Sequence, residues 1–581
     1  MAGSSLTFIL HLFAFISGVH GKVSLKTPEE QIALCKPQTF KHLDTSLGVN
    51  VLSTEATPQT NYNTTSPASF INAFEGLDFC RVEIVYNPPN SAHEVRVEIW
   101  LPLTAHAWSG RYQATGGASF KTGLGSLYFG QAIHDGYVVS STDGGNRGKD
   151  FFDLSWALKA DKTIDWDLLH IAFTSSVAEQ IIISRSVVAK YYGESPRYSY
   201  WQGCGQAGRQ GYMLAQQYPH LLDGILANAP EIHFTDLTMG EFWPQLVMKE
   251  EGIWMSECQF NFFRHKALEA CDMLDGVSDG IIYDPSICDF DPLHVVGKTY
   301  YCDGEESEVT MAMANIVRRI EEGPRTSMNT PIWYGFRPTI SMDYVAATER
   351  HSSGTLTSKP SNQASSFIKH FLLKDPTANL TKLTNTDFFS LWTQAKTTFS
   401  WLWDSFNPDL HALKAANTKL LTFHGMEDAM NPWENIARYR EHVERVMGGA
   451  NTVDEYYRLF LAPGVGHCHG WWGPEPVDPL AVLVDWVEKG EKPETMEASM
   501  VNTDGELVTR DLCAWPGKAK YMGLGDAKRA SSWSCEGGTE RGEDHAFENQ
   551  EQLAFGDSPA GRILGGLKER FEGMNLGLRI G

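Results

Sequence analysis

A glycine-rich segment between an apolar strand and a helix is the first place where residue types and spacing indicate chemistry. Residues 201–209 read Trp-Gln-Gly-Cys-Gly-Gln-Ala-Gly-Arg and follow a short apolar run that begins at Tyr198. A strand that ends in a sharp turn with small flanking residues and continues as a helix is typical of a nucleophile elbow, where an apical serine projects over the sheet. Here the apical residue is Gly205. Because glycine adopts a positive φ at little cost, the turn can persist while the nucleophilic hydroxyl is lost.

The glycine-rich segment alone would also fit an ordinary strand-to-helix turn or a phosphate loop, although it lacks the Gly-Lys-Ser/Thr ending of the latter. Two later segments favour the elbow. An apolar run at 420–423 leads into His-Gly and Asp428, and residues 461–468 place His467 on a glycine-flanked loop. Taken singly, Asp428 would be a turn or cap residue and His467 a loop histidine. Together, the chain order elbow, acid, histidine is that of the α/β-hydrolase fold.

The segments that must position these residues alternate between strand and helix patterns. Apolar residues that alternate or run together before a turn indicate strands, and longer apolar patterns that end at glycine indicate helices. The sequence predicts strands near 95–101, 137–139, 198–201, 224–226, 419–423 and 456–461, and helices over 171–192 and from the elbow to about 218. This succession predicts an α/β fold with a mainly parallel sheet covered by helices.

One long stretch interrupts this pattern. Residues 242–403 hold four cysteines, many short Asp/Gly turns and no clear periodicity, and we interpret them as a large inserted lid domain. The expected organisation is a signal peptide at 1–21, the α/β-hydrolase core in two parts at 22–241 and 404–536, the lid at 242–403, and an acidic, Gly-rich tail at 537–581.

Composition restricts the partners of the chain. The 581 residues are 42% hydrophobic, which excludes a wholly disordered or collagen-like chain. A net charge of −23 without a Lys/Arg cluster excludes nucleic acid as an expected partner, because binding of the phosphate backbone needs clustered cations. The apolar run Leu6–Ile16, followed by small residues, is too short to span a membrane and fits a signal peptide. No later stretch reaches the roughly 18 apolar residues of a membrane span.

The chain has ten cysteines. An even number behind a predicted signal peptide favours disulfides over thiol catalysis or metal binding, and none forms the C-x-x-C pair of a zinc ribbon. Glycosylation sequons at Asn63 and Asn379 are compatible with secretion. We therefore expect a secreted, disulfide-bonded protein.

Taken together, these motifs resemble the tannase and feruloyl esterase family of secreted fungal and bacterial hydrolases. That family carries Cys-Ser at the elbow, an Asp on a later loop and His-Cys at the third site, with the two cysteines joined. The matching positions are Cys204-Gly205, Asp428 and His467-Cys468. Further matches lie at 209–211, 218–219, 223–225 and 470–474, and the resemblance covers roughly residues 35–535.

The resemblance implies five disulfides: Cys35–Cys80, Cys204–Cys468, Cys258–Cys271, Cys288–Cys302 and Cys513–Cys535. A bond between Cys204 and Cys468 would hold the histidine loop against the elbow. It would also remove the thiolate that a metal site at His467-Cys468-His469 would need. The adjacent Trp471-Trp472 pair either lines a pocket for aromatic ligands or packs beneath the loop.

An acidic loop at 271–281, inside the predicted lid, is a further match. It carries three carboxylates within eight residues, separated by glycines, which suits a hard cation such as Ca²⁺, although the spacing is not that of an EF-hand. A solvated acidic turn is the alternative. By family similarity the ligands would be the carboxylates of Asp272, Asp275 and Asp279 and the carbonyls of Val277 and Ile281, and the ion would be structural.

The elbow departs from the family pattern. Ser-Thr-Gly-Gly of the family is replaced by Gly205-Gln206-Ala207-Gly208, three changes in four positions. Without the serine oxygen no acyl-serine can form. The Asp428–His467 pair can still act as a general base or acid, and the backbone N–H groups of Gln206 and of Gly116 or Gly117 can still polarise a carbonyl.

Three hypotheses about function follow from this departure. In the first, the protein is an enzyme whose His467–Asp428 pair acts directly on a small phenolic or polyketide-type ester or carbonyl substrate, by water-mediated hydrolysis, elimination, isomerisation or cyclisation. In the second, it is an inactive relative that binds such a ligand or another protein. In the third, it is an ordinary carboxylic ester hydrolase with an unrecognised nucleophile.

Overall fold

The computed structural model describes residues 27–45, 48–66, 72–302, 304–326, 328–470 and 472–537. The predicted signal peptide at 1–21 lies outside the described residues, as does the predicted tail apart from its first residue.

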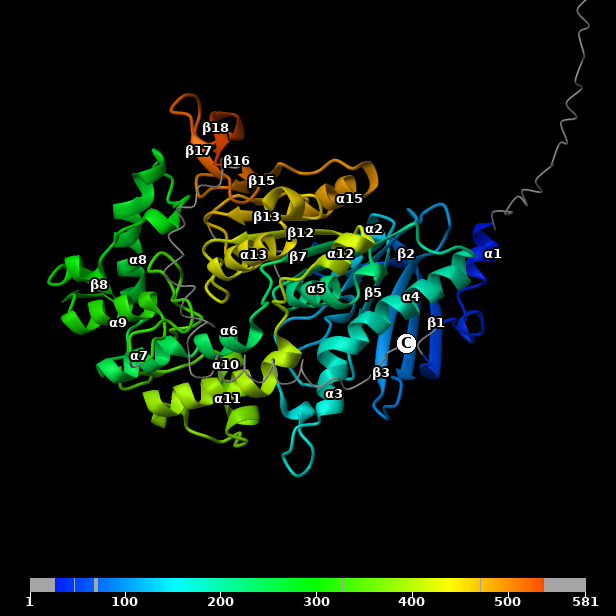
Figure 1. The fold of residues 1–581 in the computed structure, drawn as a ribbon, viewed down its shortest axis with the longest axis horizontal. Helices are drawn as coiled ribbons and strands as arrows, with labels where there is room; N and C mark the ends of the chain where they lie inside the picture. Colours follow the sequence, from blue (N-terminus) through cyan, green and yellow to red (C-terminus); the bar gives the residue numbers. More distant parts are fainter. Residues whose placement is uncertain are drawn as a thin grey trace, which may run out of the picture.

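A nine-stranded sheet forms the centre of the molecule, in the order β1-β2-β3-β5-β4-β6-β7-β12-β13 (Figure 1). The first strands of this order, from β1 to β3, pair antiparallel with one another, and β3 pairs antiparallel with β5. From β5 to β13 every pairing is parallel. The mainly parallel sheet predicted from the sequence is therefore confirmed. The strands are β1 Asn50–Tyr62, β2 Leu77–Asn87, β3 Val95–Pro102, β4 Arg111–Thr115, β5 Val138–Thr142, β6 Tyr198–Cys204, β7 Gly224–Asn228, β12 Lys419–Gly425 and β13 Tyr457–Ala462.

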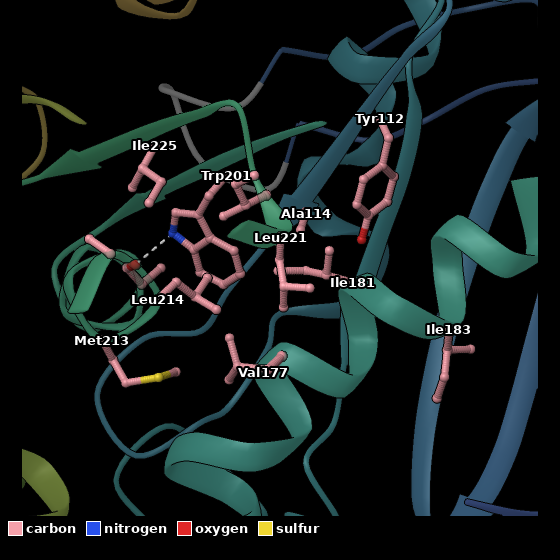
Figure 2. Close-up of a cluster of buried hydrophobic side chains, with 14 of the residues drawn as sticks. Tyr112, Ala114, Val177, Ile181, Ile183, Trp201, Met213, Leu214, Leu221 and Ile225 are labelled. Carbon is pink, nitrogen blue, oxygen red and sulfur yellow. Dashed lines mark hydrogen bonds between the residues drawn. The ribbon is translucent and has the colours of Figure 1, made fainter. Parts of the chain in front are cut away.

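Helices cover both faces of this sheet, which explains the unbroken apolar runs in its parallel strands. On β6, Trp201 packs towards α4 and α5, whereas the neighbouring Tyr200 packs in the cluster on the opposite face. Figure 2 shows Trp201 among side chains of α4 and α5, with its indole N–H donating to the carbonyl of Ala207 at 2.9 Å. The first face is covered by α4 Ser176–Tyr192, α5 Gln206–Gln217 and α13 Glu434–Met447, and the second by α2 Phe129–His134 and α15 Pro479–Lys489.

The long helix predicted over 171–192 is present and begins earlier. It starts as α3 Trp166–His170, passes through a π-helical turn at Ile171–Ser175, and continues as α4 to Gly193, which ends it with φ of 87°. Within the described residues, the combined helix Trp166–Tyr192 is long and apolar enough to cross a membrane, with a mean hydropathy of 1.2. However, 83% of its apolar window is buried inside the protein, as expected of a core helix.

The insertion between β7 and β12 forms a helical unit with a core of its own, drawn mainly in green in Figure 1. We call this unit the lid; its first helix, α6 Phe234–Gly240, lies before the start predicted at residue 242. Its apolar cluster also takes in Phe120 and Leu154 from the first part of the chain, which joins the lid to the sheet domain. The lid contains the helices α6 Phe234–Gly240, α7 Trp243–Glu251, α8 Glu257–Cys271, α9 Met311–Glu322, α10 Asn362–Phe367 and α11 Asn385–Trp403 and the short hairpins β8 Thr299–Cys302 with β9 Glu305–Glu308 and β10 Thr348–Arg350 with β11 Leu356–Ser358.

The last described part of the chain adds two small antiparallel units that the sequence patterns did not indicate. A three-stranded sheet comprises β14 Glu475–Pro476, β15 Thr495–Val501 and β16 Leu507–Cys513, and a hairpin comprises β17 Lys518–Tyr521 and β18 Trp533–Glu536. The remaining α-helices of the described residues are short, namely α1 Pro28–Ile32, α12 His411–Ala416 and α14 Ala450–Val453.

Five disulfides are present, and three of them are the predicted pairs Cys35–Cys80, Cys204–Cys468 and Cys513–Cys535. The predicted pairs Cys258–Cys271 and Cys288–Cys302 are wrong, because the lid contains Cys258–Cys302 and Cys271–Cys288 instead. The reason is the helix α8, which has Cys258 in its first turn and Cys271 at its end. About 13 residues of helix separate these two sulfurs by roughly 20 Å, far beyond the reach of a disulfide.

Candidate active site

The turn between β6 and α5 has the backbone geometry of a nucleophile elbow. Gly205 precedes α5 with φ of 61° and ψ of −120°, a conformation that disfavours residues with a Cβ. A second glycine, Gly208, allows the helix to approach β7, because a Cβ there would lie 2.4 Å from the carbonyl oxygen of Asn228. The local sequence therefore builds the elbow through small residues, and the apex carries no side chain.

Asp428 lies in the loop after β12, fully buried, and its carboxylate accepts hydrogen bonds on both oxygens. Oδ1 accepts from the backbone N–H groups of Met430 and Asn431 at 2.8 and 2.9 Å. Oδ2 lies 2.7 Å from Nδ1 of His467 and 3.2 Å from Nε2 of His424. Burial alone would raise the pKa of Asp428, but the charge of His467 and the hydrogen bonds from both histidines outweigh it and hold the pKa well below its usual range.

His467 lies in the loop after β13 with its side chain 20% exposed. Its Nδ1 is held by Asp428, and the adjacent Cys468, with φ of 68°, is bonded to Cys204 at the end of β6. Burial lowers the pKa of His467, but Asp428 and then the more distant Glu231 and Glu241 raise it, to about 9. These carboxylates favour the imidazolium form of the ring at neutral pH, and the disulfide anchors the ring to the elbow.

The ring of His467 points at the empty apex of the elbow. A Cβ built on Gly205 would lie 2.8 Å from Nε2 of His467 and 3.3 Å from Oε1 of Glu231. The structure thus brings together the three predicted residues Gly205, Asp428 and His467. Among the described residues, no serine hydroxyl is within hydrogen-bond distance of the His467 ring, whose side-chain partners are Asp428 and Glu231.

Glu231 is a member of this site that the sequence motifs did not identify. It follows β7, and its backbone N–H donates to the carbonyl of Gly205 at 3.3 Å. Its side chain is 3% exposed, with Oε1 3.7 Å from Nε2 of His467. Burial raises the pKa of Glu231 to about 7, although the charge of His467 opposes this shift. The sequence contained one signal for Glu231. It is an acidic residue just past the carboxyl end of β7, the strand next to β6, and α/β folds place their binding sites at this edge of the sheet.

Of the predicted oxyanion donors, Gln206 lies at the start of a helix and Gly117 is engaged in a hydrogen bond. Gln206 is the first residue of α5, so its N–H has no acceptor within the helix. The N–H of Gly117 donates to Oε1 of Gln210 at 3.1 Å. The same oxygen would lie 2.0 Å from a Cβ at Gly116, so the Gln210 amide fills the space beside this glycine pair. Gly117 becomes available to a ligand only if the Gln210 side chain moves.

The acidic loop predicted to hold calcium follows α8. Oδ1 of Asp272 accepts from the N–H of Gly280 at 2.9 Å, and Oδ2 of Asp279 lies 3.2 Å from the Arg510 guanidinium. Oδ2 of Asp275 is buried and has no hydrogen-bond partner among the described residues. Burial raises the pKa of Asp275 to about 6, and the charges of Asp279 and Asp272 add to the effect of burial. An orphaned carboxylate oxygen beside two like charges fits a cation, but across the described residues no group of three or more His, Cys, Asp or Glu side chains converges in a metal-ligand arrangement.

The tryptophan pair is only partly within the described residues, because Trp471 lies outside them. Trp472 is 45% exposed, and the guanidinium of Arg264 lies over its ring at 5.0 Å from the centroid. Its described contact is therefore a cation–π pair with the lid helix α8.

The chain matches a known protein family, and it is similar to several named proteins and solved structures. The family model described as tannase and feruloyl esterase matches residues 80–536. A "Probable feruloyl esterase" of Arthroderma benhamiae is 39% identical over 464 residues, which cover 79% of this chain and 86% of the relative. The "Tannase" of Aspergillus oryzae is 25% identical, over 85% of this chain and 92% of the relative. Among solved structures, the tannin acyl hydrolase of Aspergillus niger superposes with a TM-score of 0.77 at 24% identity, over 87% of this chain and 95% of that chain.

Proposed function

Because the chain belongs to the tannase and feruloyl esterase family of ester hydrolases, we propose that it acts on the ester or carbonyl group of a small phenolic or polyketide-type molecule through His467 and Asp428, without an acyl-serine. The family match supports the ester-type substrate. The relatives' printed names, feruloyl esterase and tannase, support its phenolic character.

The observation that carries this proposal is the distance of 2.8 Å between Nε2 of His467 and the position of an absent Cβ on Gly205. The imidazole and its carboxylate partner are kept in place beside an apex that has no nucleophile. A substrate carbonyl above the apex would meet the N–H of Gln206 on one side and the ring of His467 on the other. Asp428 fixes the ring orientation and stabilises its charge.

Water is then the nucleophile for hydrolysis. The attacking oxygen comes from solvent, and the ring of His467 exchanges a proton with the reacting groups in a single chemical stage. The same acid–base pair can shift a proton between carbon and oxygen of a polyketide-type carbonyl, which is the chemistry of isomerisation and cyclisation. Neither route passes through a covalent enzyme intermediate.

The test is an assay of the protein, and of its His467→Ala and Asp428→Asn variants, with aromatic methyl esters. Mass spectrometry of the intact protein during turnover accompanies the assay. Conversion that is lost in both variants, without any acyl adduct, supports the proposal. An acyl adduct would instead establish an ordinary hydrolase with an unrecognised nucleophile. Conversion that survives His467→Ala unchanged would refute a role for the pair.

One observation favours a second function, a catalytically inactive relative that binds a ligand or a partner. The N–H of Gly117 is occupied by the side chain of Gln210, which leaves the oxyanion site incomplete. Substitution of Gln210 with Ala separates the two functions, because an enzyme gains or keeps activity when this donor is released. A binding protein shows no turnover in either form.

Two further proposals concern the setting of the site. We propose that Asp272, Asp275 and Asp279, with the carbonyls of Val277 and Ile281, hold a structural Ca²⁺ ion in the lid, supported by the orphaned oxygen of Asp275. The ion would neutralise these carboxylates and stabilise the lid.

We also propose that the protein enters the secretory pathway, which the five disulfides support.

A further inference from the structure

We infer that Glu231 is the catalytic base of this site: its carboxylate takes a proton from the attacking water, while the His467 imidazolium gives a proton to the leaving oxygen. This inference rests on the proposed function and assigns a role within it. It places the base on the loop after β7 rather than at the elbow after β6.

The geometry of the elbow supports this assignment. The empty position beside Gly205 is bounded by Nε2 of His467 at 2.8 Å and Oε1 of Glu231 at 3.3 Å, measured from the built Cβ. These two groups therefore face the same point from the loops that follow β7 and β13. A substrate that opens the site by a small movement of the ring would contact both, with water between the carboxylate and the carbonyl carbon.

The burial of Glu231 is the independent observation. The side chain is 3% exposed, and its Oε2 has no hydrogen-bond partner among the described residues. Burial of an acceptor without a partner is unfavourable, and more so for a charged group. An ion pair at 3.7 Å through the other oxygen does not satisfy Oε2. Buried ionisable groups in such unfavourable surroundings are typical of catalytic sites.

The charged groups around Glu231 set its protonation. The charges of His467 after β13, Asp428 after β12 and Arg209 on α5 act on the pKa of Glu231. Glu231 in turn raises the pKa of Glu241 after α6 and of Tyr344 in the lid. The guanidinium of Arg209 donates to Gln206, Ser405 and the carbonyl of Phe173 rather than to Glu231. His467 is therefore the cationic group with the largest effect on the pKa of the Glu231 carboxylate.

The pKa values place acid and base in the required states. Burial raises the pKa of Glu231 to about 7, and Asp428, Glu231 and Glu241 raise that of His467 to about 9 against the effect of burial. Between these values Glu231 is a carboxylate and His467 is an imidazolium. A neutral imidazole, which would be needed if His467 were the base, is a minor form in that range. The two groups titrate as a coupled pair that holds one proton.

Hydrolysis uses Glu231 and His467 in turn. Glu231 accepts a proton from water, the water oxygen bonds to the carbonyl carbon, and the N–H of Gln206 stabilises the oxyanion. The C–O bond to the alcohol then breaks as Nε2 of His467 gives its proton to the leaving oxygen. A proton passes from the Glu231 carboxyl to His467 and restores the starting state. One ester and one water become one acid and one alcohol.

The experiment compares Glu231→Gln with a matched control, Glu179→Gln, which neutralises another buried carboxylate, one that accepts from Tyr86 in the sheet core. Glu231→Gln should lower kcat at least 100-fold, and the activity that remains should lose the rise near pH 7. Glu179→Gln should keep the wild-type pH profile. In Glu231→Ala, added formate should restore part of the activity, as a small carboxylate can for a missing base.

A binding measurement provides a readout that does not depend on turnover. The hydrate of an aryl trifluoromethyl ketone carries the two oxygens of a tetrahedral adduct formed by water. It should bind at least tenfold more weakly to Glu231→Gln than to the wild type in calorimetry. Equal binding, or wild-type kcat and pH profile in Glu231→Gln, would overturn the role of Glu231. If His467→Ala is inactive at the same time, the proposed function survives; if His467→Ala is fully active, the proposed function fails as well.

Discussion

Restoring a serine by Gly205→Ser should give an esterase that works only at high pH. The apex already has the backbone geometry of an elbow, but the His467 ring lies close to the space that a side chain at this position would need. The new Cβ would meet Nε2 at 2.8 Å, so the ring must retreat by about 0.6 Å to reach an ordinary contact of 3.4 Å. The positive φ adds strain of about 1–3 kcal/mol for any residue other than glycine. We therefore expect a less stable protein that still folds.

The pH dependence follows from the charge of His467. A serine nucleophile needs a neutral imidazole to take its proton. With the pKa of His467 raised to about 9, only roughly 1% of the rings are neutral at pH 7. The hydrolysis rate of the variant should therefore rise about tenfold per pH unit between pH 7 and 9 and then level off. Adding Glu231→Gln removes one of the carboxylates that raise this pKa, so the rise should move to lower pH.

The assay is kcat/KM for an aromatic methyl ester between pH 6 and 10, corrected for spontaneous hydrolysis, with intact-protein mass spectrometry for the acyl-serine. Gly205→Ala is the matched control, since it introduces the same Cβ and the same strain without the hydroxyl. A serine variant with full activity that is independent of pH from 6 upward would refute the imidazolium at this site. An unchanged profile after Glu231→Gln would refute its influence on the ring.

Three other predictions test features around the site. Burial raises the pKa of Glu427 to about 8, so the folded state binds more protons than the unfolded state between about pH 4.5 and 8. The free energy of unfolding should therefore fall over that range, by up to about 1.4 kcal/mol per pH unit from this group. Glu427→Gln should flatten the corresponding decline of Tm with pH. A calcium chelator should lower the Tm of the wild type but not that of Asp275→Asn, and a wild-type Tm that ignores both chelator and Ca²⁺ would contradict the ion site. Removing the Cys204–Cys468 bridge, which closes a 264-residue separation, should cost about 2–5 kcal/mol of stability by denaturant titration and lower activity more than removal of Cys513–Cys535 does.

Much of the site could be predicted because it depends on local backbone requirements and chain order. The small residues around Gly205 permit the turn, and the strands before Asp428 and His467 are apolar enough to be recognised. Parallel strands bring their carboxyl ends to one edge of the sheet, so residues that follow those strands meet in space. The elbow, the acid and the histidine were therefore found without knowledge of the rest of the fold.

The parts that the sequence did not predict depend on contacts between segments without a common pattern. The two wrong disulfides were carried over from the family resemblance, which gave no view of the lid helices, whereas α8 carries Cys258 and Cys271 to opposite ends of a 15-residue helix. The hydrogen bond between Gln210 and Gly117 involves a flexible side chain, and no sequence pattern predicts it. Glu231 follows a strand but belongs to no motif, and its importance appears only when the Gly205 apex is seen to be empty.

The change at Gly205 and the presence of Glu231 are connected through the backbone. The N–H of Gly205 donates to the carbonyl of Asn228 at 3.0 Å, and the N–H of Glu231 donates back to the carbonyl of Gly205 at 3.3 Å. A serine at the apex and the Glu231 carboxylate in the loop after β7 would both lie beside Nε2 of His467 and would compete for it. The extra carboxylate would also keep that ring protonated, which suits an acid and opposes a base. A buried Glu231 thus disfavours an acyl-serine mechanism at neutral pH, where the ring is protonated, whereas a water nucleophile uses both the empty apex and the additional charge.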